Sequence, residues 1–196
     1  MSKLETNTID TVSGTSTLQV GSTNTSTITL GVSGDTINVP SGVTINNNGT
    51  QTGFGGTNTP AFKVNRNGSN QSISTASSTK LAHNNVVFDT DSGFDTTNNR
   101  FTVPSGKAGK YFIGAAARFD SSVNASRLLS MLYKNGGNVA EENMNNDDEV
   151  SASVFTILDL SAGDYLEHYV YQNTGSTKSF KGQNITTYFF GYRLVE

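Results

Sequence analysis

The densest charge in this sequence is an acidic segment, Glu141 to Glu149, which contains Asn145, Asp147 and Asp148. Carboxylate and amide oxygens are the ligands that Ca²⁺ takes in proteins. The spacing does not match an EF-hand loop, so the segment is either a solvated loop or a calcium site of another kind. We therefore keep calcium at Asp147 and Asp148 as one alternative and expect no other cofactor. Asp89, Asp91 and Asp95 form a second, weaker candidate.

Carbohydrate recognition would use exposed aromatic rings beside Asn and Asp side chains in loops. Tyr133, Tyr171 and Asn173 fit this description, although Tyr and Phe also serve as core residues. The predicted binding residues are Asn145, Asp147, Asp148, Tyr171 and Asn173.

Catalytic chemistry has little support in the sequence. There is no cysteine, and the two histidines are His83, in a predicted exposed turn, and His168, in a predicted strand, on its surface or at an interface. No nucleophile-elbow motif accompanies the many Ser and Asp residues. We predict no catalytic residues and no enzymatic activity.

The amino-acid composition and net charge argue against several classes of partner. Charged residues make up 15% of the chain and the net charge is −3, which argues against nucleic acid as a partner. No apolar run is long enough to insert in a membrane. The start, Met1-Ser2-Lys3-Leu4-Glu5, lacks the apolar region of a signal peptide, so we expect none there.

Composition changes near residue 56. Residues 1–56 are rich in Thr, Ser, Asn and Gly, and apolar side chains alternate in runs such as Ile28/Leu30/Val32 and Ile37/Val39. This alternation predicts short strands with one buried face. Burying so few side chains would not offset the entropy lost on ordering one chain. The segment is therefore either disordered or an intertwined β-stalk of several copies.

Residues 57–196 read as a β domain. Turn signals such as Pro104-Ser105-Gly106 and Asn135-Gly136-Gly137 separate short alternating runs, which predicts a sandwich or jelly roll. The last run, Tyr188 to Leu194, is apolar on both faces, so we expect a central strand whose second face lies against a neighbouring subunit. The predicted strands are Ala61–Val64, Thr79–Leu81, Asn85–Asp89, Arg100–Val103, Gly109–Arg118, Leu128–Lys134, Glu149–Leu160, Tyr165–Gln172 and Thr186–Leu194.

These runs resemble the globular head of complement C1q and its tumour-necrosis-factor-like relatives. The resemblance rests on Ala61-Phe62, Gly109-Lys110-Tyr111-Phe112, Lys134-Asn135-Gly136, Leu158-Asp159-Leu160 before Gly163-Asp164, and Phe190-Gly191-Tyr192-Arg193-Leu194. It implies a jelly roll of about ten strands that forms a homotrimer, with both termini at the base and apex loops that meet partners. The corresponding apex loops are Asp120–Arg127, Asn138–Asp148 and Tyr171–Lys178.

The segment Gly34 to Ile45, together with Gly49 to Gly55, resembles the stalks of marine bacteriophage tail-fibre proteins. The two resemblances imply a virion protein: a trimeric tail fibre or spike whose head binds a host surface glycan or protein, and whose stalk meets other tail or capsid proteins. The alternative is a structural adaptor, head fibre or decoration protein without receptor binding. A glycan-cleaving enzyme would need paired carboxylates in a groove, and residues 1–56 offer only Asp10 and Asp35.

Overall fold

The computed structural model describes residues 20–21, 23–24, 26–49, 58–120, 127–143 and 151–194. The chain divides into two units, Met1–Gly53 and Phe54–Glu196. The described residues contain strands, turns and extended segments but no helix. Consequently, no helix in this part of the chain is long and apolar enough to cross a membrane.

The N-terminal unit is extended over its described residues and turns at 33–34 and 41–42. Asp35 closes the first turn: its amide donates to the Val32 carbonyl (3.0 Å) and its carboxylate accepts from the Val32 amide (2.8 Å). The predicted strands of this segment are absent from its described residues in the single chain. Its apolar side chains are exposed, with Leu30 at 66% and Val32 at 77%. The intertwined stalk therefore stays a prediction about several copies.

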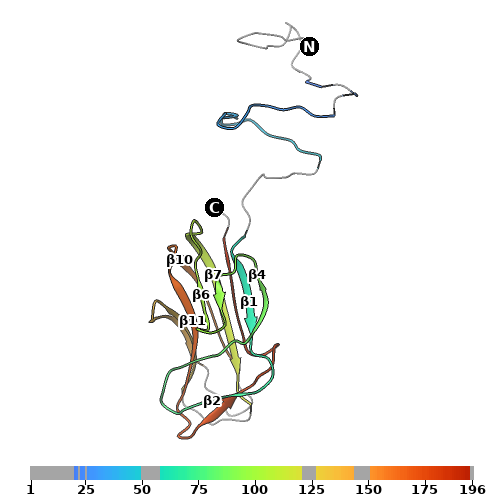
Figure 1. The fold of residues 1–196 in the computed structure, drawn as a ribbon. Helices are drawn as coiled ribbons and strands as arrows, with labels where there is room; N and C mark the ends of the chain where they lie inside the picture. Colours follow the sequence, from blue (N-terminus) through green and yellow to red (C-terminus); the bar gives the residue numbers. More distant parts are fainter. Residues whose placement is uncertain are drawn as a thin grey trace. The chain divides into compact units, whose positions relative to one another are not determined.

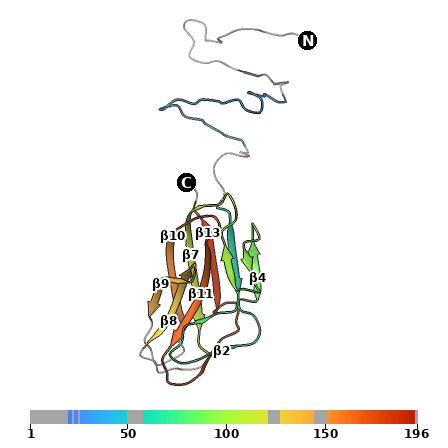
Figure 2. The same cartoon turned by 60° about the vertical axis from the view of Figure 1, so that its left-hand side comes forward.

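The second unit is a two-sheet antiparallel sandwich (Figure 1). One sheet has the order β10-β7-β13-β1-β4, and the other has the order β5-β6-β11-β8-β9 with β3 paired to β11. A two-stranded sheet, β12-β2, lies at the end of the sandwich away from the C-terminus (Figures 1 and 2). The strands are β1 Ala61–Asn65, β2 Gln71–Ile73, β3 Thr79–Lys80, β4 Asn85–Asp89, β5 Phe94–Asp95, β6 Arg100–Thr102, β7 Gly109–Arg118, β8 Leu128–Lys134, β9 Gly137–Asn143, β10 Ser151–Leu160, β11 Tyr165–Gln172, β12 Lys178–Phe180 and β13 Tyr188–Arg193.

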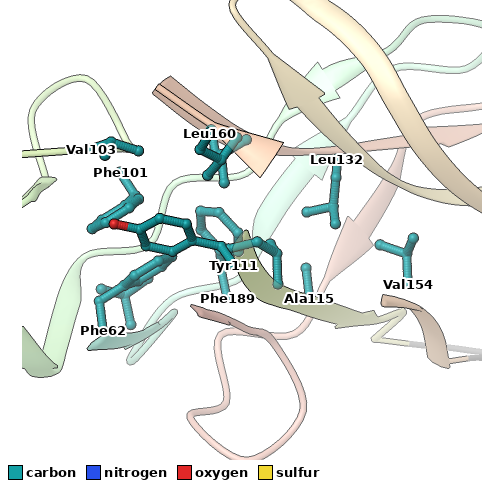
Figure 3. Close-up of a cluster of buried hydrophobic side chains, with 12 residues drawn as sticks. Phe62, Phe101, Val103, Tyr111, Ala115, Leu132, Val154, Leu160 and Phe189 are labelled. Carbon is teal, nitrogen blue, oxygen red and sulfur yellow. The ribbon is translucent and has the colours of Figure 1, made fainter. Parts of the chain in front are cut away.

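Aromatic rings fill the core between the sheets (Figure 3). Phe62 stacks on Phe101 with ring centroids 4.2 Å apart and meets Phe189 edge-on at 5.0 Å. The Tyr111 ring is buried and its hydroxyl donates to the Lys107 carbonyl at 2.5 Å. Burial raises the pKa of Tyr111 to about 12, so its hydroxyl stays protonated. A second buried cluster contains Ile73, Leu81, Ala117, Phe119, Leu128, Val170 and Phe180.

The predicted all-β sandwich is confirmed, and so is Gly109–Arg118 as a strand despite its run of three alanines. One loop prediction is wrong in part, because Asn138–Asn143 belongs to strand β9 and not to an apex loop. Nearly every residue of β9 is exposed, so this strand lacks the alternation by which buried-face strands are recognised. Strands β2, β5 and β12 were also missed, each only two or three residues long.

We predict that a chain starting at Thr57 folds into the sandwich but melts several degrees below the full-length protein. The reason is that the exposed apolar side chains of residues 20–49 add stability only when several copies bury them together. Circular dichroism melts at equal protein concentration measure the difference. Identical melting temperatures would show that the N-terminal unit adds no stability.

Candidate functional site

The outward side of the five-stranded sheet carries a group of aromatic and aliphatic residues that we call the aromatic face. Phe155 and Ile157 of β10 are 52% and 58% exposed. Phe112 stacks parallel to Phe155 at 6.3 Å and lies 6.0 Å from Phe190. The members of the aromatic face are Phe112, Phe155, Ile157, Tyr188, Phe190 and Tyr192.

Gly114 allows these rings to lie against the sheet. It is the register partner of Phe155 on β10 and of Phe190 on β13. A Cβ on Gly114 would lie 2.6 Å from Phe155 Cδ1 and 2.7 Å from Phe190 Cε1, closer than atoms can pack. The two rings therefore cover the space that a side chain would need, and they form part of an apolar surface. Apolar surface of this kind marks interaction sites in soluble proteins.

A chain of hydrogen bonds runs through the interior of the sandwich. Ser130 Oγ lies 2.9 Å from His168 Nε2, and His168 Nδ1 lies 3.1 Å from His83 Nε2. All three side chains are fully buried. The predictions of an exposed His83 and a surface or interface His168 are therefore wrong. His83 follows β3 in a segment that the structure folds inward, and His168 faces the core side of β11.

Burial sets the protonation of the two histidines in this hydrogen-bond chain. It lowers the pKa of His83 to about 3, with a further contribution from the positive charge of Arg66. Burial, and then the neighbouring His83, holds the pKa of His168 well below its usual value. When His83 donates to His168 and His168 donates to Ser130, His83 Nδ1 is left as a bare acceptor. This tautomer avoids a buried N–H without a partner among the described residues.

The Ser–His–His order resembles a nucleophile with its base, but the fully buried Ser130 cannot meet a substrate. The hydrogen-bond chain therefore acts as a polar part of the core, which specifies how β8 and β11 pair.

Two of the predicted binding residues come together at the end of the sandwich away from the C-terminus. The Arg127 amide donates to Asn173 Oδ1 (2.8 Å), and the Arg127 guanidinium lies 5.6 Å from the Tyr171 ring centroid. Buried Gln172 braces the following loop: it donates to the Ser176 carbonyl (2.9 Å) and accepts from the Thr174 amide (2.8 Å). Asn145, Asp147 and Asp148 lie outside the described residues, so the acidic and calcium predictions remain predictions.

The weaker acidic candidate, Asp89, Asp91 and Asp95, makes hydrogen bonds and an ion pair within the loops around it. The Asp89 carboxylate accepts hydrogen bonds from the amides of Gly93 (3.1 Å) and Phe94 (2.8 Å). Asp95 caps the next turn through Thr97, and Asp91 pairs with Lys107 at 3.3 Å. A cavity of about 340 Å³ lies among these loops, but across the described residues no group of acidic, His or Cys side chains could hold a metal ion.

The sandwich has the jelly-roll fold of murine APRIL, which superposes with a TM-score of 0.52 and 13% identity, over 68% of this chain and 98% of APRIL. This superposition confirms the jelly-roll fold that the sequence resemblance implied. The globular domain of the zebrafish complement 1qA protein gives a TM-score of 0.46 and 20% identity, over 69% of this chain and 97% of that domain.

Two Bacillus subtilis (strain 168) proteins are similar in sequence. The phage-like element PBSX protein XkdV is 30% identical over 111 residues, which cover 52% of this chain and 16% of XkdV. The uncharacterized protein YqcC is 31% identical over 111 residues, which cover 53% of this chain and 30% of YqcC. This chain thus matches less than a third of the length of either relative. No protein-family model matches the chain.

We predict that the protein loses stability as the pH falls from 7 to 5. Both histidines are neutral when folded, whereas the unfolded chain protonates them below a pKa of about 6.5. Stability is therefore fully present above that pKa and declines below it, by about 4 kcal/mol at pH 5 for two histidines. Urea unfolding at fixed protein concentration measures the decline.

The matched variant is His83→Gln, which retains hydrogen-bonding atoms but removes one titrating group. We expect it to show about half of the wild-type decline between pH 7 and pH 5. A decline as steep in the variant as in the wild type would show that groups other than this histidine cause it.

Proposed function

We propose that this chain is a structural protein of a bacteriophage virion or phage-like particle. In this proposal it forms a homotrimer, its jelly-roll head contacts the host surface, and its N-terminal unit joins other tail or capsid proteins. The phage setting is supported by the similarity to the PBSX protein XkdV. The observation that carries the proposal is the aromatic face, because a lone chain would leave it in water.

The position of the apolar surface supports association of copies. The aromatic face runs over three neighbouring strands, β10, β7 and β13, and therefore forms one continuous surface. It would be covered on association of copies, with a gain of about 25 cal/mol for each Å² of apolar area removed from water. Closed homo-oligomers use such self-complementary or head-to-tail patches.

A non-enzymatic role agrees with the chemistry of the described residues. The serine and histidines that are hydrogen-bonded to each other are sealed in the core, and the carboxylates near the 340 Å³ cavity are engaged by backbone amides and Lys107. Recognition by Tyr171 and Asn173, together with Asn145 and the acidic residues Asp147 and Asp148, is part of the same proposal.

The alternative is an adaptor, head fibre or decoration protein that does not touch the host. Immunogold electron microscopy of intact particles separates the two. Label on the distal part of a tail, together with binding of the purified protein to cells, supports the host-contact role. Label confined to internal joints or the capsid, without binding to cells, supports the alternative. Melting with and without EDTA tests calcium at Asp147 and Asp148.

We predict that Phe155→Asp dissociates the trimer. A charge at position 155, beside Phe112 and Phe190, would be buried without a partner in the assembly, which costs roughly 3 kcal/mol or more. Sedimentation equilibrium should then show the 20.8 kDa monomer at concentrations where the wild type is trimeric.

Ile185→Asp is the matched control, because Ile185 is 78% exposed, lies in the turn that precedes β13 and is not a member of the aromatic face. It should leave the oligomeric state unchanged. A wild-type protein that sediments as a monomer at micromolar concentration would refute the trimer.

A further inference from the structure

The outward side of strand β11 presents tyrosines at regular intervals. Leu166, His168, Val170 and Gln172 are buried on the core side, so Tyr165, Glu167, Tyr169 and Tyr171 point outward. The three tyrosines are half-buried. From Tyr165 to Tyr171 the row is about 20 Å long at ~3.3 Å per residue.

Strand β8 widens this row into a surface. Tyr133 is the register partner of Glu167, and its ring stacks on Tyr169 with centroids 4.2 Å apart. Met131 and Leu129 are the register partners of Tyr169 and Tyr171, and both are almost fully buried. They form an apolar layer on this side of the sheet, which holds the tyrosine rings on a firm base. We call Tyr133, Tyr165, Tyr169 and Tyr171 the tyrosine face.

The charges beside the tyrosine face are already paired. Glu167 is buried and accepts from Lys80 Nζ at 2.9 Å, with Arg100 Nε 4.0 Å away. Arg100 also lies over the Tyr165 ring at 4.6 Å.

At the other end of the row, the Arg127 guanidinium lies 3.3 Å from Glu141 and beside the Tyr171 ring. Arg100 and Arg127 therefore each have a carboxylate and a tyrosine ring as neighbours, and Lys80 shares Glu167 with Arg100. Three cations against two carboxylates leave one net positive charge beside the row, which is little for a polyanion.

We propose that the tyrosine face binds a neutral polysaccharide chain. Tyrosine rings offer rigid amphipathic surface with little side-chain entropy to lose, which suits the apolar C–H face of a sugar ring. Their hydroxyls and the neighbouring Arg, Glu and Lys groups donate to and accept from sugar hydroxyls. A 20 Å row accommodates several sugar units in a line, whereas a compact ligand would use a pocket.

The aromatic face and the tyrosine face differ in chemistry, and we therefore assign them different binding partners. Four of the six residues of the aromatic face are Phe or Ile, and this face suits the matching face of another copy of the chain. The tyrosine face lies on the other sheet and stays open to solvent when the aromatic face is covered. Three copies in one assembly then raise weak single-site binding through avidity. This inference rests on the proposed host contact and assigns it a surface and a ligand class.

The test uses the full-length protein on a printed array of neutral and anionic bacterial oligosaccharides. The same protein is applied to Bacillus subtilis cells, the organism of both relatives. We expect binding to neutral oligosaccharides and to cells. Periodate, which cleaves sugar diols, should abolish cell binding, and protease treatment of the cells should not.

The deciding variant is Tyr133→Leu with Tyr169→Leu, which keeps the apolar cover over Met131 but removes both rings. It should weaken binding at least about tenfold. The matched control, Tyr133→Phe with Tyr169→Phe, retains the rings and should stay within about threefold of the wild type. Sedimentation and melting of both variants check that the fold and the trimer persist.

The outcomes separate this inference from the proposed function. Cell binding that is lost on protease treatment, or that the Leu variant retains, overturns the tyrosine face as a glycan site but leaves host contact standing. Preference for anionic oligosaccharides overturns the neutral class. Array binding that depends on the rings, without any binding to cells, supports the glycan site and argues against this host. If the protein binds neither the oligosaccharide array nor the cells, both the inference and the proposed host contact are overturned.

Discussion

The register of β13 against β7 decides which aromatic residues build the core and which face outward. Phe189 pairs with Ala115 and enters the core, whereas its neighbour Phe190 pairs with Gly114 and joins the aromatic face. A slip of one residue would exchange the two sides of the strand. Small residues fix the register: a Cβ on Gly191 would lie 2.4 Å from Ile113 Cδ1, as one on Gly114 would collide with Phe155. The core and the aromatic face are thus specified by the same backbone pairing.

The outward sides of the two sheets differ in chemistry because β13 and β11 differ in the residues that point away from the core. β13 is apolar at nearly every position, so further burial of its outward side would add stability. β11 alternates apolar residues with Tyr and Glu, and Glu167 on its outward side is paired with Lys80. If both proposals hold, one fold provides a surface for its own copies and a separate surface for a polar ligand.

Sequence pattern predicted long strands such as β10 and β11 because a strand with one buried face largely repeats every second residue. It missed β9, which is an exposed edge strand, and it placed His83 in a solvent-exposed turn. The partner of His83 is far along the chain, at His168, and no local pattern reports a contact across 85 residues. Tyr133 and Tyr171 were recognised as candidate sugar contacts, but the stack of Tyr133 on Tyr169 needs the β8–β11 register.

Both units of the chain present more apolar surface than one copy can bury, and they do so with different sequences. In residues 20–49 the exposed apolar side chains are aliphatic, mostly β-branched, and are spaced by Thr, Asn and Ser, which leaves few contacts available within one chain. In the head the aromatic face contains rings that lie over Gly114. Association of copies would reward both units at once, and the low charge of the chain opposes it little. A single N-terminal unit cannot offset the entropy that it loses on ordering. Association of the folded heads would hold the N-terminal units of several copies together, and this raised local concentration would favour the ordering of a stalk.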